Sequence, residues 1–377
     1  MANIRVGIIR CDCHALLFAC TMEKHDPLLL RDPLPPEQSK KTPLSWQRGL
    51  IHRIFYTRFG QPETMTVEFV DGFEIVKLWD QNRFNAEVVQ RILLGKPEIC
   101  ETLDEVTEDV DLVFLSDCNG DGSDHLELAR PGLLKGLPTF VDKPFALKTS
   151  DVLTMLALSR ENHAPILCLS ILRTLPAAER FAARRGEIGE LQFATIQNEG
   201  DVMAALVHPV SLAQTLFGTG IESVRCMGDT TPTNIRLYYP EDSHGPPRGV
   251  MLNTDTGDSP GGAMYASCYG TQGVVHSPPF DEWEFPLGAV NITKQMKQMV
   301  LERSNPVPDD EMIEVIAAVD AARQSLQQGG QSVPVQEIIE KAGAESAAET
   351  RAPHVPLKPV LLTPGIQGDT PVQFVPA

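Results

Sequence analysis

The chain has 377 residues, 42% of them hydrophobic and 22% charged, which is the composition of a globular protein with more than one domain. Its formal net charge of −18 argues against binding the phosphate backbone of a nucleic acid. No apolar run is long enough to span a membrane, the start lacks the layout of a signal peptide, and the eight cysteines are scattered. We therefore expect a cytoplasmic protein with reduced thiols.

The apolar run Ile4–Ile9 predicts a first strand, followed by a helix. A dinucleotide-binding protein carries G-x-G-x-x-G between these elements, because glycines let the backbone approach a pyrophosphate. Here only Gly7 remains, and Arg10, Asp12 and Ala15 stand near the positions where glycines are expected. Asp12 would repel a pyrophosphate, and Arg10 would offset part of that repulsion.

The segment Cys11-Asp-Cys-His14 contains thiol and imidazole groups, which are good zinc ligands. No second Cys/His pair with finger-like spacing follows, so we predict no metal site. A cysteine at the start of a helix can have a lowered pKa, which makes Cys11 or Cys13 a candidate reactive thiol. The alternative is a loop with partly buried thiols.

Residues 25–72 form a long insertion in the expected alternation of strands and helices. We expect this insertion to form a lid or an interface; the alternative is a surface segment with its own small apolar cluster. The next predicted strand, Phe73–Asp80, ends on an acidic residue. In dinucleotide-binding folds an acid there binds the adenosine ribose and favours NAD over NADP. Asp80 is therefore a candidate ribose ligand, and the alternative is a helix cap or turn residue.

The stretch Val110–Ala146 is the most informative part of the chain. It contains an apolar strand, a polar turn, a helix that begins at His125, a second strand and the turn Asp142-Lys143-Pro144. Strand, helix and strand in this space form a βαβ unit with parallel strands. Because ligands bind beyond the carboxyl ends of such strands, Asn119 and the 142–144 turn lie at the same rim. A lysine beside a carboxylate there is a candidate acid, base or electrostatic clamp.

This order of elements, with Asn119, His125 and the acid-Lys-Pro turn, resembles the Gfo/Idh/MocA family of glucose–fructose oxidoreductases and inositol dehydrogenases. The family's turn is usually Glu-Lys-Pro, so Asp142 is a mild departure, and the degenerate glycine loop marks a divergent member. The family's lysine lies between the nicotinamide and the substrate, which implies catalytic roles for Asp142 and Lys143. The implied cofactor-binding residues are Gly7, Arg10, Cys11, Asp12, Asp80, Ser116, Asn119 and Lys143.

The family resemblance continues at Arg173-x-x-Pro176 and at Gly186–Leu191. It implies that Arg173 lies near the substrate, and the alternative is a salt bridge. A helix over 206–217 carries His208, which matches a family histidine suited to proton transfer. Its usual acidic partners, four residues before or three after, are replaced by Ala204 and Ser211. The alternative for His208 is a structural role.

We predict an α/β fold with a Rossmann-type parallel sheet in residues 1–147 and an α+β domain in residues 148–350. Several strands without intervening helices indicate that the second sheet is open and mainly antiparallel. Such a sheet leaves an apolar face exposed, so we expect a homodimer or homotetramer. Residues 351–377 form a proline-rich tail that either wraps a neighbouring subunit or is mobile.

The leading functional hypothesis is an NAD- or NADP-dependent oxidoreductase that acts on a sugar, polyol or related alcohol. Lys143 would polarise or deprotonate the reacting hydroxyl with help from His208, and the small-molecule substrate would lie between the domains near Arg173. A second hypothesis is a binding or regulatory protein that kept the fold and lost the redox chemistry. A third is a redox-neutral lyase or glycoside-cleaving enzyme that uses bound NAD.

Overall fold

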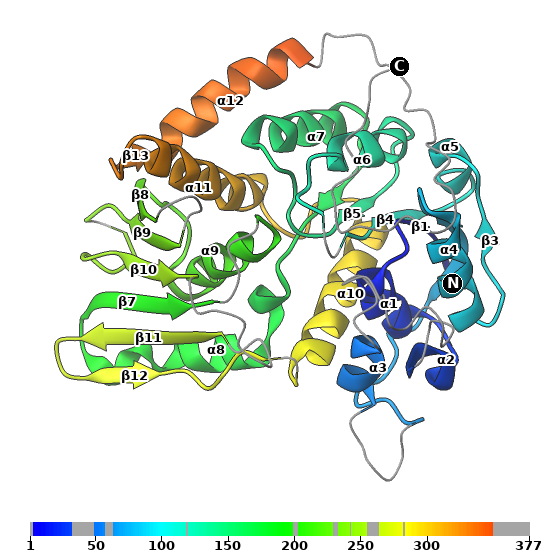
Figure 1. Ribbon diagram of the computed structural model, residues 1–377, viewed down its shortest axis with the longest axis horizontal. Coiled ribbons are helices and arrows are strands. Elements are labelled where there is room, and N and C mark those ends of the chain that lie inside the picture. The colour runs from blue at the N-terminus through cyan, green and yellow to red at the C-terminus, as the bar shows by residue number, and fades with distance from the viewer. Residues whose placement is uncertain are drawn as a thin grey trace.

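The computed structural model describes residues 3–31, 49–56, 63–117, 120–198, 203–228, 233–241, 243–254, 264–281 and 283–349. The chain forms two β-sheets that lie side by side, each with its own helices (Figure 1). The α/β class and the succession of a parallel and then a mainly antiparallel sheet are confirmed.

The first sheet has six strands in the order β3-β2-β1-β4-β5-β6, and the pairings are all parallel. Its strands are β1 (Ile4–Ile9), β2 (Phe73–Trp79), β3 (Glu98–Ile99), β4 (Leu112–Leu115), β5 (Thr139–Val141) and β6 (Ile166–Leu167). All four residues of β4 are buried, as expected for a strand covered on both faces. Strand β6 lies beyond residue 147, the predicted end of the first domain.

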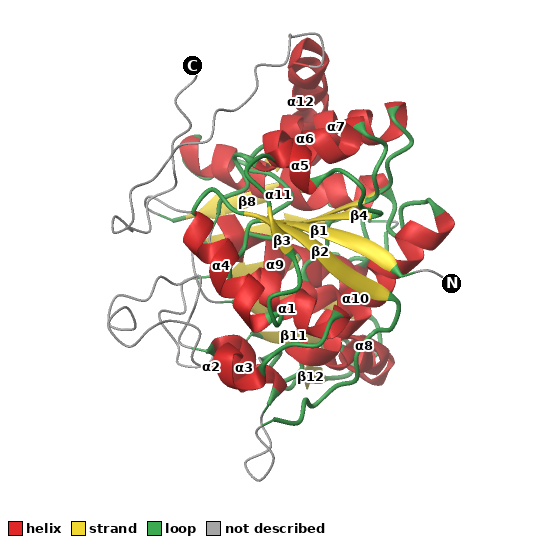
Figure 2. Cartoon of the chain, turned by 90° about the vertical axis from the view of Figure 1, so that its right-hand side faces the viewer, coloured by secondary structure: helices red, strands yellow, loops and turns green. Residues whose placement is uncertain are grey.

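Helices cover both faces of this sheet (Figure 2). One face carries α1 (Cys13–Met22) and α4 (Arg83–Ile92), and α10 (Phe285–Glu302) packs against α1. The other face carries α5 (Leu103–Val106), α6 (His125–Leu134) and α7 (Thr149–Glu161). The strand order reverses between β1 and β4, so a crevice opens beyond their carboxyl ends.

The described part of the insertion contributes two short helices, α2 (Pro27–Arg31) and α3 (Leu50–Phe55). They contact each other, and their buried side chains, Leu30, Ile54 and Phe55 among them, join the main core against α1 and α10. This part of the insertion therefore packs on outer helices of the first sheet. Residues 32–48 and 57–62, which also belong to the predicted insertion, lie outside the described residues.

The second sheet has seven strands in the order β12-β11-β7-β10-β9-β8-β13. Its strands are β7 (Leu191–Gln197), β8 (Ser223–Met227), β9 (Asn234–Tyr238), β10 (Val250–Asn253), β11 (Tyr265–Gly270), β12 (Val274–His276) and β13 (Val333–Pro334). The pair β7–β10 is parallel and the other pairs are antiparallel. The fold class prediction of an open, mainly antiparallel sheet is thus confirmed.

One face of this sheet packs against helices, and among the described residues no helix covers the other face. The remaining elements are η3 (Ile171–Thr174), α8 (Pro176–Ala183), η4 (Arg184–Ile188), α9 (Met203–Phe217), α11 (Asp309–Gln327) and α12 (Val335–Glu349). Buried and less buried residues alternate along β9 and β10, which is the pattern of a strand covered on one side. On the open face, the Arg236 guanidinium lies 5.8 Å from the ring centroid of Phe193 and 5.1 Å from that of Tyr238.

Within the described ranges, every helix is too short or too polar to cross a membrane.

Candidate functional site

The loop between β1 and α1 begins with an unusual residue. Arg10 has a φ of 66°, a left-handed conformation that favours glycine. The backbone at this position therefore has the conformation expected of a glycine, although the residue is an arginine. The Ser116 hydroxyl donates to the Arg10 carbonyl at 2.7 Å, and the Arg10 guanidinium is ion-paired with Asp124. Gly7 lies inside β1, where a Cβ would stand 2.4 Å from the Val106 carbonyl oxygen. Close packing against the end of α5 therefore explains Gly7.

The amides of this loop already have partners from the chain itself. Asp12 is the N-cap of α1, and its carboxylate accepts from the amides of His14 and Ala15 at 2.8 and 3.2 Å. Asp80 accepts from the Cys11 amide at 2.8 Å and from the Asn82 amide at 2.6 Å. In a Rossmann fold the pyrophosphate binds to these amides at the start of the first helix. Two carboxylates of the protein take that position here.

The charges around the loop are mostly negative. Burial opposes the charge of Arg10, yet the carboxylates of Asp124, Asp117, Asp80 and Asp12 together raise the pKa of its guanidinium. Burial also raises the pKa of Asp80 against the opposing influence of Arg10. A diphosphate would meet more carboxylates than cations and would find the amides occupied. The residues present therefore do not fit the diphosphate of a nicotinamide dinucleotide.

His125 forms a buried pair with Asp117 at the end of β4. Its Nε2 lies 3.1 Å from a carboxylate oxygen of Asp117 and its Nδ1 lies 3.3 Å from the Phe145 carbonyl, so both ring nitrogens face acceptors. Burial opposes both charges, but the hydrogen bond between the two groups raises the pKa of His125 and lowers that of Asp117. The pair ties the β4 loop to the chain after β5. Asn119, the other predicted residue of this loop, lies outside the described residues.

Asp117, Asp124 and His125 lie within 4.8 Å of one another, and among the described residues they are the only group with the spacing of a metal site. Arg10 is ion-paired with Asp124, and His125 is bonded to Asp117. An arginine and a histidine of the chain thus already pair with these carboxylates. The segment Cys11-Asp-Cys-His14, by contrast, brings no such group together in the part of the chain that the structure describes.

Cys11 is fully buried and its thiol lies 3.6 Å from the Trp79 carbonyl. Burial, together with Asp80 and Asp12, raises the pKa of this thiol well above its usual value. Burial and the neighbouring carboxylates therefore disfavour a thiolate at Cys11, which argues against the hypothesis that this thiol is reactive.

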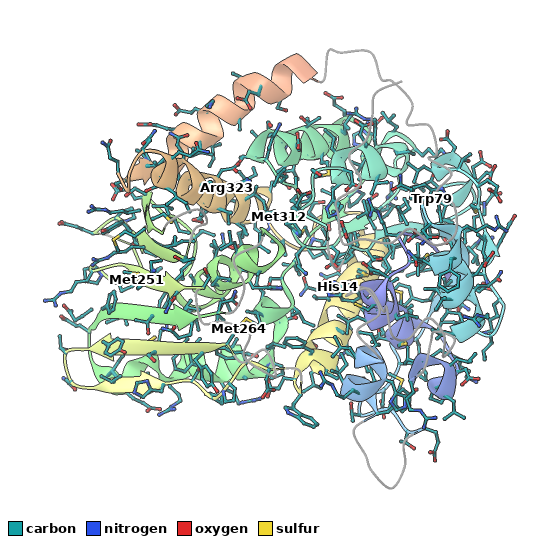
Figure 3. All side chains as sticks on the ribbon, viewed as in Figure 1. His14, Trp79, Met251, Met264, Met312 and Arg323 are labelled. Atoms are coloured by element: carbon teal, nitrogen blue, oxygen red, sulfur yellow. The ribbon has the colours of Figure 1, made fainter. Side chains whose placement is uncertain are left out.

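The opposite rim of the crevice carries Asp142 and Lys143, which follow β5 and are both buried. The Asp142 carboxylate is paired with Nδ1 of His14, in the first turn of α1. Figure 3 shows His14 on the side of the first domain that faces the second. Burial opposes the charge of Asp142, but His14 and Lys143 outweigh it and lower the pKa of the carboxyl. An ionised carboxylate is thus held between an imidazole and an ammonium group.

His208 reaches the same region from α9. Its Nδ1 lies 2.7 Å from the hydroxyl of Ser170, which caps η3. Burial, followed by the charges of Lys143 and His14, lowers the pKa of His208 to about 3. A serine hydroxyl thus takes the place of the acidic partner that the family resemblance implies. Sequence reasoning missed Ser170 because nothing in its neighbourhood marks it as a partner of a helix 38 residues away.

Arg173 donates to the Gln214 side chain at 3.1 Å and is ion-paired with Glu311. It also lines a narrow pocket between the domains, whose cavity volume is about 20 Å³. The polar residues of this pocket are Lys143, Ser170, Arg173, Ser211 and Glu311. The salt bridge expected as the alternative is present, and Arg173 also lines the pocket, so a substrate contact for Arg173 stays a prediction.

No protein-family model and no curated protein sequence matches the chain. Solved structures do match. A probable dehydrogenase from Thermotoga maritima has a TM-score of 0.62 at 13% identity, with 89% of this chain and 100% of that chain covered. An oxidoreductase from Agrobacterium radiobacter, in complex with NAD+, L-tartaric acid and magnesium, gives the same four values. The scyllo-inositol dehydrogenase from Lactobacillus casei, with bound NAD(H) and scyllo-inositol, has a TM-score of 0.60 at 12% identity over 89% and 99% of the two chains.

The protein therefore has the two-domain fold of these dehydrogenases and oxidoreductases. The likeness predicted from the sequence is confirmed at the level of the fold. At identities of 12–13%, this similarity shows the fold and not the activity or the substrate.

Proposed function

We propose that the protein binds a small hydroxylated molecule of the sugar or polyol class between its two domains, without a nicotinamide dinucleotide in the β1–α1 loop. The observation that carries this proposal is the pair of carboxylates, Asp12 and Asp80, on the amides that would otherwise hold a pyrophosphate. Fold and function are separable, because the site and not the sheet determines the chemistry. Of the three hypotheses, the binding or regulatory protein that kept the fold and lost the redox chemistry agrees best with this loop.

The ligand class is supported by the crevice that the fold retains. Two of the similar structures hold scyllo-inositol and L-tartaric acid, which are both rich in oxygen acceptors. In this chain, Lys143 and Arg173 line the pocket between the domains, together with two serine hydroxyls. Such side chains supply several hydrogen-bond donors for a molecule of that kind.

Lys143 is the group most suited to act on the ligand. It follows β5 at the rim of the crevice, beside the ionised Asp142 and near the pocket. An ammonium group beside a carboxylate serves as an acid or an electrostatic clamp on a ligand oxygen. The His14–Asp142 pair behind it holds the carboxylate in place and can relay a proton.

The direct test is calorimetric titration of the full chain with NAD, NADH, NADP and NADPH. We expect no binding up to about millimolar concentrations, since occupied amides and like charges oppose a diphosphate. A second titration uses scyllo-inositol, glucose, gluconate and L-tartrate. We expect binding of at least one of them, weakened by Lys143→Met but not by Lys148→Met, an exposed lysine five residues further on. Equal effects of the two substitutions would contradict the role of Lys143.

A second candidate function is the NAD- or NADP-dependent oxidation of a sugar, polyol or related alcohol. It is favoured by the fold and by the position of Lys143 after β5. Tight binding of one cofactor in the first titration would favour this candidate and overturn the first. Bound cofactor without net NADH production would instead indicate a redox-neutral lyase or glycoside-cleaving reaction.

We also propose that the chain forms a homodimer or homotetramer through the open face of the second sheet. The support is the half-buried aromatic group on that face, where Phe193 and Tyr269 have ring centroids 5.8 Å apart and Arg236 lies over Phe193. Sedimentation velocity should give a single oligomer, and Phe193→Glu should shift it toward the monomer. A monomeric wild type would contradict this proposal.

A further inference from the structure

His14 and Asp142 form a pair across the crevice of the first domain. His14 lies in the first turn of α1, after β1, and Asp142 directly follows β5. Strand β4 lies between β1 and β5 in the sheet, so the pair spans the point where the strand order reverses. Ligands of open parallel sheets bind at that point. The pair therefore lies where the fold places a ligand.

The carboxylate of Asp142 determines which nitrogen of His14 carries a proton. Burial raises the pKa of this carboxyl, but His14 and Lys143 outweigh burial and lower the pKa, so the group is ionised. An ionised carboxylate accepts hydrogen bonds and cannot donate them. The Nδ1 atom of His14, which faces this carboxylate, must therefore be the donor. A neutral ring with its proton on Nδ1 has a lone pair on Nε2, which can take up a second proton.

Of the two histidines at this site, His14 is the better proton acceptor. Burial, followed by the charges of Lys143 and His14, lowers the pKa of His208 to about 3, so that ring rarely binds a proton near neutral pH. The His14 side chain is 18% exposed, whereas the side chain of Asp142 is 3% exposed. His14 also lies on the side of the first domain that faces the second (Figure 3). The imidazole is thus accessible, and its carboxylate partner is buried behind it.

Resting on the function proposed above, we propose that His14 takes a proton from a carbon atom beside the carbonyl group of a keto-sugar or related hydroxy-ketone, with Asp142 as its positioning residue. Carboxylates of the chain occupy the loop between β1 and α1, so the reaction is of a class that needs no nicotinamide. Removal of such a proton requires a base and a cation near the carbonyl oxygen. His14 is the base, and Lys143, which lines the pocket between the domains, is the cation.

This step conserves atoms and electrons without an oxidant or a reductant. The C–H bond breaks, its proton forms a bond to Nε2 of His14, and its electron pair forms a carbon–carbon double bond. The electrons of the carbonyl double bond move to the oxygen beside Lys143, which gives an enediolate. Return of the proton to the same carbon regenerates the ketone. Its return to the former carbonyl carbon, with a proton shift between the two oxygens, gives the isomeric sugar.

The role of Asp142 is tested by the position of the proton on His14. Nitrogen-15 NMR of the full chain labelled at histidine distinguishes the two neutral tautomers, and His14→Gln assigns the signal. We expect the neutral ring, reached by raising the pH, to carry its proton on Nδ1. In Asp142→Asn we expect a mixture of tautomers, because an amide both donates and accepts. An Nε2–H tautomer in the wild type would overturn the proposal.

The proton transfer itself is tested by deuterium exchange. Fructose, sorbose and dihydroxyacetone are incubated with the full chain in deuterium oxide without any nicotinamide, and proton NMR follows the C–H signals beside the carbonyl group. We expect exchange into at least one probe, slowed about a hundredfold or more by His14→Gln. The matched control is His244→Gln, which changes an exposed histidine between β9 and β10 and should leave the exchange rate unchanged.

Calorimetric titration with the same three ketones separates this inference from the function on which it rests. If a ketone binds without exchange, or exchanges equally fast with His14→Gln, proton transfer by His14 is wrong while ligand binding stands. The same conclusion follows if no ketone binds although scyllo-inositol, glucose, gluconate or L-tartrate does. If none of these molecules binds the wild type, the proposed ligand class is wrong, and the proton transfer is wrong with it.

Discussion

The two rims of the crevice differ sharply although they belong to one sheet. At the β1–α1 rim, Asp12 and Asp80 bond to the loop amides, and Arg10 is paired across to Asp124. At the β5 rim, the acid-Lys-Pro turn keeps Lys143 beside an ionised carboxylate. The strands beneath both rims are buried and paired in the same way. The difference shows that the packing of the strands determines where the two rims lie. The side chains on each rim, which are not part of that packing, determine which ligand can bind there.

The largest expected effect concerns the buried pair that supports the rim near β4. His125→Leu leaves the Asp117 carboxylate buried without its partner, which we expect to cost about 3–5 kcal/mol in the free energy of unfolding. Urea denaturation at pH 6 measures it. As a control, Arg83→Gln removes an exposed pair with Glu101 and should cost about 1 kcal/mol at most. A cost for His125→Leu as small as the control's would mean that the pair is not ionised.

The second prediction asks whether the β1–α1 rim alone excludes the dinucleotide. The double substitution Arg10→Gly with Asp12→Gly frees the amides of α1, removes a carboxylate and suits the left-handed backbone at residue 10. We expect the affinity for NADH to rise about tenfold to a hundredfold, roughly 1.4–3 kcal/mol, by fluorescence titration. Asp12→Asn is the control, because it removes the charge but keeps a side-chain cap on the amides. If the double variant binds NADH no more tightly than the wild type, residues other than Arg10 and Asp12 prevent dinucleotide binding.

The third prediction isolates the capping role of Asp12. Asp12→Ala should lower the free energy of unfolding by about 1 kcal/mol, because the amides of His14 and Ala15 lose their acceptor. Asp12→Asn should cost only a few tenths of a kcal/mol, roughly, since asparagine caps nearly as well. Equal stabilities of the alanine variant and the wild type would show that Asp12 is not the cap in solution.

The smallest effect is the pH dependence of the same buried pair. The pKa of His125 is raised, so its contribution to stability is complete below about pH 6.5 and declines as the pH rises through the folded-state value. The pKa of Asp117 is lowered, so its contribution is present above about pH 4 and lost only in stronger acid. The stability difference between wild type and His125→Leu should therefore shrink from pH 6 to pH 9. A stability difference that grows from pH 6 to pH 9 would contradict the raised pKa of His125.

The sequence by itself determined the strands of the first sheet, their parallel direction and the rim that carries Lys143. Apolar runs, turn residues and helix caps are local signals, and the right-handed βαβ rule converts them into an arrangement in space. The departure at Arg10 and Asp12 was also visible in the sequence, because a missing glycine is a local fact. For the same reason the approximate bounds of most helices and strands could be predicted.

Only the tertiary structure decided which side chains meet. Asp80 bonds to an amide 69 residues away, His14 pairs with a carboxylate 128 residues away, and Ser170 holds His208 from another element. None of these pairs has a spacing that a sequence pattern can reveal, because each depends on how two packed elements approach. Their effects on pKa also depend on burial, which no single segment determines. The family resemblance located Lys143 and His208, but packing gave His208 a serine partner and filled the phosphate loop with carboxylates.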